Sequence, residues 1–542
     1  MSPYDYIIVG AGAAGCVLAN RLSEDPQTRV LLVEAGGSDD RFLIKLPLGL
    51  LRAFRDPSLT WGYLSEPEPH LNGRVLPVPR GRVLGGSSSI NGMFFMRGHS
   101  ADFDGWQEAG CQGWSYAHVL PYFKKLESSW RGAVPYHGAS GPMPITPNAT
   151  TRLLHDPLMH TAVPAGYWTS EDLHGRVEEG FACAELTVDA RGRRASASRA
   201  YLRPARHRAN LDVMQGALTT RVLVERGRAI GIELRRGSEL RQVFADGEVI
   251  LCGGTYNSAQ LLMLSGFGAA DELASFGVRA RADLPGVGAN LSEHVRAGLQ
   301  FATREPVSFL RELRADRIAI SLLRWWLFGT GPMATQVSSC NVVIRTQTAA
   351  RQPDIQLMCN PVRMDAKIWW PLLSSRQAHL LTSDAVLLHP RSRGRVRLRS
   401  ADPTAKPRIQ FNALAEREDL ETLMRGLREA RRIYAIPPQA DLIEREIAPG
   451  AQVASDADLE RYIRATASVT QHPVGTCSMA PGPGRVVDAE LRVQGVDGLR
   501  VADASIMPTV PGGNTYGAVL MIAERAADLI RGRVLPPQRE TS

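Results

Sequence analysis

The sequence predicts an α/β protein in which a Rossmann-like parallel-sheet domain is interleaved with a second domain. Three observations support this expectation. A strand, a glycine motif and a helix follow one another within residues 5–22, a Gly- and Ser-rich segment lies at residues 80–93, and another Gly-rich turn opens a helix at residues 511–530. A chain of 542 residues has room for two or three domains. Gly-rich turns that open helices thus occur near both ends of the chain.

The composition excludes several classes of protein. Hydrophobic residues make up 44% and charged residues 22% of the chain, and no apolar run reaches the roughly 18–20 residues that span a bilayer. The net charge of +8 is spread along the chain, so we expect no nucleic-acid partner. The seven cysteines are widely spaced and form no C-x-x-C motif, so we predict no disulfide framework and assign no metal ligand. The N-terminus has no secretory signal, which predicts a cytoplasmic location.

The N-terminal motif has the features of a dinucleotide-binding site. Gly10, Gly12 and Gly15 follow an apolar strand at residues 5–9, and Glu34 stands 19 residues after Gly15 at the end of a second strand. Gly10 permits a tight turn, Gly12 lets the backbone approach a pyrophosphate, and Gly15 lets the helix pack close to the strand. This fingerprint leaves NAD and FAD open. Its place at the start of a long chain, and the Ala-Gly-Gly run after Glu34, favour FAD.

A resemblance to a known family extends this interpretation along the chain. The segment at residues 80–93, together with Phe95, Gly98 and Asp104, resembles the first signature of the glucose–methanol–choline (GMC) oxidoreductase family. Further segments that resemble the family, in the same order, are residues 254–268 (with departures at Ala259 and Phe267), 284–291 with His294, 472–476 and 501–505.

The resemblance implies a domain division and an FAD site. Residues 1–150, 200–300 and 465–542 would form the FAD-binding domain, and residues 151–199 and 301–464 an α+β substrate-binding domain built on an antiparallel sheet. Ile90 stands at or near the place where some relatives attach FAD through a His, so we expect non-covalent FAD. The residues assigned to FAD are Gly10, Gly12, Ala13, Ala14, Gly15, Glu34, Ala35, Arg82, Val83, Gly86, Ser87, Asn91, Gly92, Met93, Val222, Asp503, Ala504, Asn514 and Thr515.

His472 and Asn514 are the expected catalytic residues. Among twelve His, most would be surface or core residues, but His472 lies in a run of small and turn-forming residues that matches the family's active-site His. Asn514 lies in a Gly-rich turn, where Asn is often only a turn former or helix cap, and matches the second catalytic position of the family. A neutral imidazole can accept a hydroxyl proton, and an amide can donate a hydrogen bond to the developing alkoxide. Gln471 and Tyr516 depart from the family pattern and suggest a more polar substrate pocket.

The predicted function is FAD-dependent oxidation of an alcohol, a primary alcohol being favoured, to an aldehyde or ketone. The electron acceptor is O₂ or a quinone-like carrier, and a dehydrogenase is favoured over an oxidase. A lyase or a photodecarboxylase on the same fold are alternatives, and a non-enzymatic flavin binder is a further one.

Residues 310–328 combine four Arg with Leu, Ile, Trp325 and Trp326. We expect a lid or wall of the substrate cavity with both Trp side chains packed inward. The alternative is a basic amphipathic helix that lies on a membrane surface, which would make the protein peripheral to the inner membrane.

Overall fold

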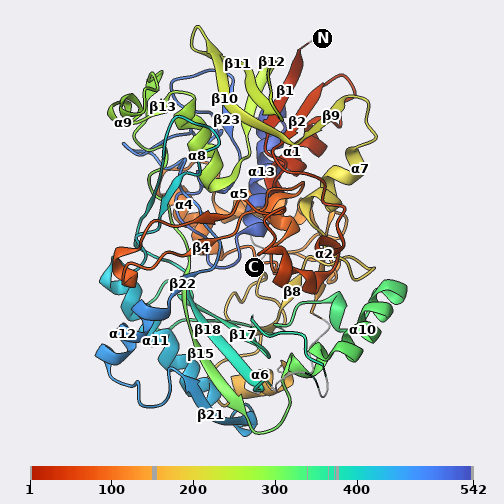
Figure 1. Ribbon diagram of the computed structural model, residues 1–542, viewed down its shortest axis with the longest axis vertical. Helices are drawn as coiled ribbons and strands as arrows, with labels where there is room; N and C mark the ends of the chain where they lie inside the picture. The colour runs from red at the N-terminus through yellow and green to blue at the C-terminus, as the bar shows by residue number, and fades with distance from the viewer. Residues whose placement is uncertain are drawn as a thin grey trace.

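The computed structural model describes residues 3–148, 155–338, 340–363, 365–370, 373 and 377–538. Two large sheets lie at opposite ends of the elongated molecule (Figure 1). The N-terminal strand belongs to one sheet, whereas the middle of the chain supplies most of the other.

The first sheet has a parallel centre, as predicted from the apolar strands. Its order is β10-β11-β12-β1-β2-β9, with β23 also paired to β12. Ile7 lies opposite Leu31 on one side and Val249 on the other, and all three are buried. Its strands are β1 (Tyr4–Val9), β2 (Val30–Glu34), β9 (Leu211–Gln215), β10 (Ala217–Glu225), β11 (Arg228–Arg236), β12 (Glu239–Leu251) and β23 (Leu499–Val501).

The two ends of the chain pack together on this sheet. Helix α1 (Ala13–Leu22) lies beside α13 (Tyr516–Arg531) (Figure 1), and Arg21 forms a 2.7 Å ion pair with the buried Glu524. Both helices bury almost all of their side chains, because α13 is covered on its other side by α5 (Tyr116–Leu126). The C-terminal segment is thus an integral part of the first sheet's core.

The second sheet is antiparallel throughout its described pairs, which confirms the expected α+β character. Its order is β21-β15-β18-β17-β16-β7, with β22 also paired to β15. Helix α11 (Arg417–Tyr434) packs on it so closely that a Cβ on Gly426 would lie 2.8 Å from Ile355 Cδ1. Its strands are β7 (Gly180–Cys183), β15 (Val295–Thr303), β16 (Cys340–Ile344), β17 (Ile355–Asn360), β18 (Leu380–Leu387), β21 (Ile443–Ala448) and β22 (Ser468–Val469).

Smaller elements connect the sheets. The helices are α2 (Phe42–Lys45), α3 (Leu50–Ala53), α4 (Ser100–Glu108), α6 (His155–Ala162), α7 (Arg203–Ala205), α8 (Gly254–Leu264), α9 (Ala270–Ser275), α10 (Ala315–Phe328) and α12 (Asp456–Thr466). The strands are β3 (Tyr63–Leu64), β4 (Pro77–Val78), β5 (Glu127–Ser129), β6 (Met143–Pro147), β8 (Glu185–Leu186), β13 (Phe267–Gly268), β14 (Ala282–Asp283), β19 (Arg395–Arg397) and β20 (Arg408–Gln410).

Helix α10 corrects one expectation. Trp325 is buried and donates from Nε1 to the Gly192 carbonyl oxygen at 2.6 Å, but Trp326 is 66% exposed. The inward packing expected for both side chains is therefore wrong for Trp326, because adjacent residues on a helix point about 100° apart. The helix lies at the edge of the molecule (Figure 1). Within the part of the chain that the structure describes, no helix combines the length and apolar character needed to cross a membrane.

Candidate active site

The glycine motif after β1 forms a tight turn. Gly10 has a φ of +101°, which favours glycine, and a Cβ on Gly15 would lie 1.9 Å from the Gly10 carbonyl oxygen. Gly12 precedes α1 and gives it no side-chain cap. The first-turn N–H groups of α1, at Ala13 and Ala14, therefore remain for an anion, as a pyrophosphate site requires.

The Gly-Ser segment lies directly against this turn. Gly85 N–H donates to the Ala11 carbonyl oxygen at 2.7 Å, and a Cβ on Gly86 would lie 2.8 Å from Gly12 Cα. Val83 pairs with Gly37 in a β-bridge just beyond β2. The two predicted cofactor segments thus meet backbone to backbone, and this cradle without side chains fits a dinucleotide phosphate.

Glu34 is buried at the end of β2. Its carboxylate accepts hydrogen bonds from Ala11 N at 2.9 Å and from Gly36 N at 2.7 Å. Burial raises the pKa of Glu34 to about 7, although these two bonds and Arg82 act in the opposite direction. The carboxyl group therefore orders the glycine turn itself, and its remaining lone pairs are available to ribose hydroxyls.

Asn91 and Met93 lie in a segment with a strained backbone. The buried Arg194, which had no role assigned from the sequence, holds this segment. Met93 has a φ of +63°, and its N–H donates to Asn91 Oδ1 at 3.1 Å. The buried Arg194 donates from Nη1 to the same Oδ1 at 2.8 Å and to the Asn91 carbonyl oxygen at 2.6 Å. Burial lowers the pKa of Arg194 to about 9. This guanidinium fixes the turn that carries Asn91, Gly92 and Met93.

Two predicted cofactor residues are already engaged by protein groups. Val222 N–H donates to Ser265 Oγ at 2.8 Å, so an adenine contact would have to use another atom. The Asp503 carboxylate accepts from Gly254 N, Ser258 Oγ and the backbone N and Oγ of Ser505. Asp503 therefore holds the start of α8 in place.

The other assigned positions are Ala35 after β2, exposed Arg82 over the Trp61 ring, Ser87 bonded to Gly81 N, Ala504 in a 3₁₀ turn, and Thr515 before α13.

The structure brings His472 and Asn514 together. Asn514 Nδ2 lies 3.0 Å from His472 Nε2, and both side chains are partly accessible. Gln471 has a φ of +73°, and Val474 exchanges backbone hydrogen bonds with Ser292. This left-handed residue and the backbone pairing aim the His472 ring at Asn514, and backbone strain of this kind is typical of active sites.

Hydrogen bonds fix the tautomer of His472. His294 Nε2 donates to the Leu388 carbonyl oxygen at 2.9 Å, since a carbonyl can only accept, so neutral His294 has its lone pair on Nδ1. That atom lies 3.1 Å from His472 Nδ1, which therefore carries the proton, and Thr470 Oγ1 lies 2.9 Å from the same nitrogen. His472 Nε2 keeps its lone pair beside Asn514 Nδ2, an NH₂ group that can only donate. The ring is thus prepared to act as a base at Nε2.

The charges around His472 are positive. Burial, and next the Arg80 guanidinium, lower the pKa of His472 to about 3. Arg80 Nη2 donates to Gln471 Oε1 at 3.1 Å and has no ion-pair partner among the described residues. Behind the ring, Glu293 Oε1 accepts from His472 N at 2.6 Å, and burial raises the pKa of Glu293 to about 8. Burial therefore favours the uncharged forms of both His472 and Glu293 beside the Arg80 guanidinium.

A dinucleotide cradle together with a His–Asn pair defines a class of flavin-dependent enzymes that oxidise alcohols. Comparisons with known proteins agree with this class. The GMC oxidoreductase models match residues 4–296 and 390–523. The chain belongs to the GMC oxidoreductase family.

Relatives cover almost the full length of the chain. An oxygen-dependent choline dehydrogenase from Rhizobium etli is 41% identical over 533 residues, which are 98% of this chain and 96% of the relative. The structure of pyridoxine 4-oxidase from Mesorbium loti is similar with a TM-score of 0.86, 32% identity and coverage of 97% of this chain and 98% of that one. Formate oxidase from Aspergillus oryzae RIB40 gives a TM-score of 0.91 at 26% identity, covering 98% of each chain.

The chain is therefore an FAD-dependent oxidoreductase that acts on CH–OH donors, as expected from its motifs. The comparisons give no support to the lyase alternative. Arg80 and His294 lie within the family segments but had no role assigned from the sequence, and Glu293, Thr470 and Arg194 were not expected in the site. No local pattern indicates Arg80, Glu293, His294 or Arg194, because each acts through a partner more than 100 residues away in the chain, whereas Thr470 lies two residues before His472 and its place beside that residue is the only local signal.

Proposed function

We propose that this enzyme oxidises a neutral or anionic polar alcohol, with His472 Nε2 as the base and Asn514 as the group that orients the substrate oxygen. The observation that carries the proposal is the 3.0 Å contact between Asn514 Nδ2 and a His472 nitrogen whose lone pair is fixed by His294. Bound FAD supplies the hydride acceptor. His472 would take the hydroxyl proton, and the Asn514 amide would donate to the oxygen as negative charge grows.

The binding of FAD in this proposal uses the residues assigned from the sequence. The backbone cradle around Gly12 and Gly86 would hold the pyrophosphate, and Glu34 the ribose. The discontinuous ranges 1–150, 200–300 and 465–542 would form the FAD domain, with residues 151–199 and 301–464 completing the substrate domain. The strand membership of the two sheets supports this division, although β22 (Ser468–Val469) and β15, which begins at Val295, both belong to the second sheet.

Anaerobic mixing with alcohol tests the catalytic pair. His472→Ala is expected to slow reduction of bound FAD by about 10²–10⁴-fold, and Asn514→Ala by about 10²–10³-fold. His160→Ala, at an exposed position of α6, is the matched control and should reduce at the wild-type rate. An unchanged rate in His472→Ala would show that another group takes the proton.

The charge beside His472 supports a substrate without a cationic head. The Rhizobium relative is named for choline, whose quaternary ammonium group favours aromatic or acidic surroundings. Here, the partly buried Arg80 has no ion-pair partner among the described residues, and Gln471 stands beside it. A fixed positive charge at this position disfavours a second cation within a few ångströms.

A pair of isosteric alcohols separates these substrate classes. Choline and 3,3-dimethylbutan-1-ol have the same shape but differ in charge, so kcat/KM is expected to be at least about tenfold higher for the neutral alcohol. Arg80→Gln is expected to reduce this preference. A preference for choline that Arg80→Gln leaves unchanged would contradict the role of Arg80, while leaving the role of His472 intact.

The electron acceptor is proposed to be O₂ or a quinone-like carrier, since the relatives reported above include an oxygen-dependent dehydrogenase and two oxidases. Peroxide formation with O₂ is measured beside reduction of a quinone analogue. Peroxide formed at the rate of alcohol oxidation, whether or not the quinone is present, would make the enzyme an oxidase.

A peripheral contact with the cytoplasmic side of the inner membrane is the second part of the proposal. Exposed apolar side chains cover one side of α10, and Arg311 and Arg324 nearby are exposed without an ion pair in the described part of the chain. Apolar rings flanked by Arg suit an anionic lipid surface. The exposed apolar residues of α10 are Ile320, Leu323, Trp326, Leu327 and Phe328.

Vesicle sedimentation tests this contact. The protein is expected to sediment with vesicles that contain phosphatidylglycerol and to remain in solution with phosphatidylcholine alone. A Trp326→Ser and Phe328→Ser double variant should lose sedimentation while it retains alcohol oxidation. Val163→Ser, at another exposed apolar position, is the control. Equal sedimentation of the α10 variant and the wild type would refute the contact.

A further inference from the structure

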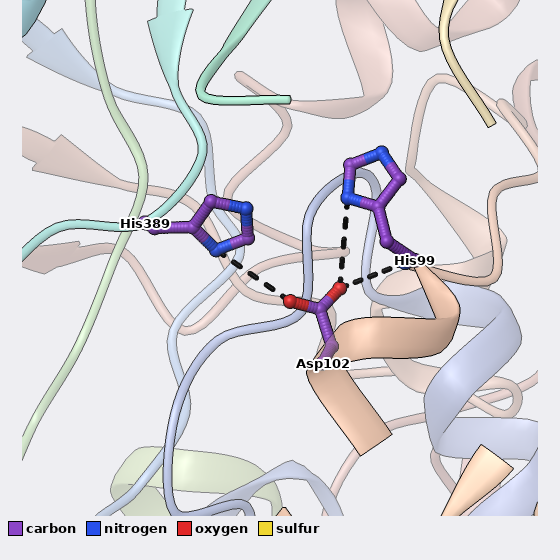
Figure 2. A group of neighbouring side chains, drawn as sticks. All are labelled: His99, Asp102 and His389. Atoms are coloured by element: carbon purple, nitrogen blue, oxygen red, sulfur yellow. Dashed lines mark hydrogen bonds and ion pairs between the residues drawn. The ribbon is translucent and has the colours of Figure 1, made fainter. Parts of the chain in front are cut away.

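A second cluster of ligand-type side chains lies outside the catalytic pair. His99 precedes α4, Asp102 lies in the first turn of α4, and His389 follows β18 (Figure 2). One ligand atom from each residue lies within 4.8 Å of the others. Figure 2 shows the Asp102 carboxylate between the two imidazole rings.

The hydrogen bonds of His389 place a lone pair opposite a carboxylate. His389 Nε2 donates to the Pro353 carbonyl oxygen at 3.0 Å, so the neutral ring has its lone pair on Nδ1. That atom lies 3.5 Å from Asp102 Oδ1. The Gln352 NH₂ group bridges these two electron-rich atoms, at 3.2 Å from His389 Nδ1 and 3.1 Å from Asp102 Oδ1, and a cation bound between them would replace this bridge.

His99 is the second observation. Its side chain is 2% exposed, and neither ring nitrogen has a hydrogen-bond partner among the residues that the structure describes. His99 Nδ1 lies 3.8 Å from Asp102 Oδ2, too far for a hydrogen bond. Leaving both ring nitrogens unpaired costs about 1–3 kcal/mol for each group, and a buried group of this kind calls for an unseen ion or water.

We propose that His99, Asp102 and His389 bind a divalent transition-metal ion such as Zn²⁺. Two imidazoles and one carboxylate form a donor set that this ion prefers, and a water would complete a tetrahedron. Bonds of about 2.0–2.2 Å would bring the three donors to about 3.5 Å from one another, which requires shifts of under about 1 Å. The Pro353 carbonyl would orient His389 as partners of metal-bound His commonly do.

The ion would join three segments at the back of the catalytic turn. Asp102 Oδ2 accepts from His99 N and from Gly512 N, each at 2.7 Å, and Asp102 Oδ1 accepts from Gln352 Nε2 at 3.1 Å. Gly512 stands two residues before Asn514 in the chain. The metal site therefore serves as a structural clamp on the turn that carries Asn514, and it takes no part in proton transfer.

Metal analysis of the full-length, FAD-loaded protein tests the site. After chelation and removal of the chelator, the protein is titrated with Zn²⁺ and with Co²⁺. We expect one equivalent of bound metal per chain, Co²⁺ absorption bands at wavelengths longer than those of the flavin, and a higher Tm with Zn²⁺. His99→Phe and His389→Gln should each lose the bound equivalent, whereas His160→Ala should retain it.

Two results would overturn the site. One is a wild-type protein that binds less than a tenth of an equivalent of either metal while its FAD content is normal. The other is retention of the bound equivalent in both His variants. If His99→Phe fails to fold, His389→Gln, at a partly accessible position, still decides between these outcomes.

Discussion

Replacing His294 with leucine removes the acceptor that holds the proton of His472 on Nδ1. The bond is neutral in the resting enzyme, where burial and then the neighbouring His472 hold the pKa of His294 well below its ordinary value. When His472 accepts the substrate proton, the same bond has a charged donor. Bonds to charged groups contribute about 1.5–3 kcal/mol against about 0.5–1.5 kcal/mol for neutral ones. The hydrogen bond therefore stabilises the transition state by about 1–1.5 kcal/mol relative to the resting enzyme, which corresponds to about tenfold in rate.

Thr470 shares this bond, so the assay needs two variants. Thr470 Oγ1, at 2.9 Å from His472 Nδ1, can accept the proton alone, and His294→Leu should therefore slow anaerobic flavin reduction only a few-fold. The His294→Leu and Thr470→Val double variant should show the full effect of about tenfold. His294→Gln, which retains an acceptor oxygen, is the matched control. A double variant within twofold of the wild-type rate, with normal FAD content, would refute the tautomer argument.

Three further predictions concern neighbouring groups. Burial raises the pKa of Glu293 to about 8, whereas its pKa in the unfolded chain is about 4.5. Between these two pH values the folded protein keeps a proton on Glu293 that the unfolded chain loses. The free energy of unfolding therefore decreases as the pH rises from 4.5 to 8, by at most about 1.4 kcal/mol per pH unit. Glu293→Gln, which resembles the protonated acid, should flatten that decrease in urea unfolding, and an unchanged slope would contradict it. A Cβ on Gly512 would lie 2.3 Å from His99 Nδ1, so Gly512→Ala should lower the free energy of unfolding in urea by about 1–3 kcal/mol. An unchanged free energy of unfolding would show that the His99 ring can move aside. Acid precipitation should release all FAD into the supernatant, because Ile90 cannot attach it, and flavin fluorescence left in the pellet would show another attachment site.

Local signals in the sequence were sufficient for the cofactor turn. Gly10, Gly12 and Gly15 depend on backbone sterics within a few residues, so their spacing alone predicts the turn that the structure contains. The antiparallel second sheet came from the family resemblance. Three of its strands, β7, β16 and β17, are buried along almost their whole length, which hides the alternation that would identify them from the sequence pattern.

The surroundings of His472 were beyond sequence reasoning. His294 contacts it from 178 residues away, and the hydrogen bond between Arg80 and Gln471 spans 391 residues. Such contacts depend on how the two sheets pack, which no window of sequence contains. Trp326 was misplaced for a different reason: α10 is apolar on more than one face, so the pattern does not say which ring points inward.

The pairing of α1 with α13 has a consequence for synthesis of the protein. The glycine turn leaves the ribosome at the beginning of translation, whereas Asn514 and α13 leave it at the end. At about 5–20 residues per second, the first half of the cofactor cradle waits for roughly 25–100 s. During that interval, the apolar face of α1 that α13 later covers is open to solvent and to chaperones. The packing of α1 is therefore completed only when α13 (Tyr516–Arg531) has been synthesised, and a truncation that removes α13 would leave that face of α1 uncovered.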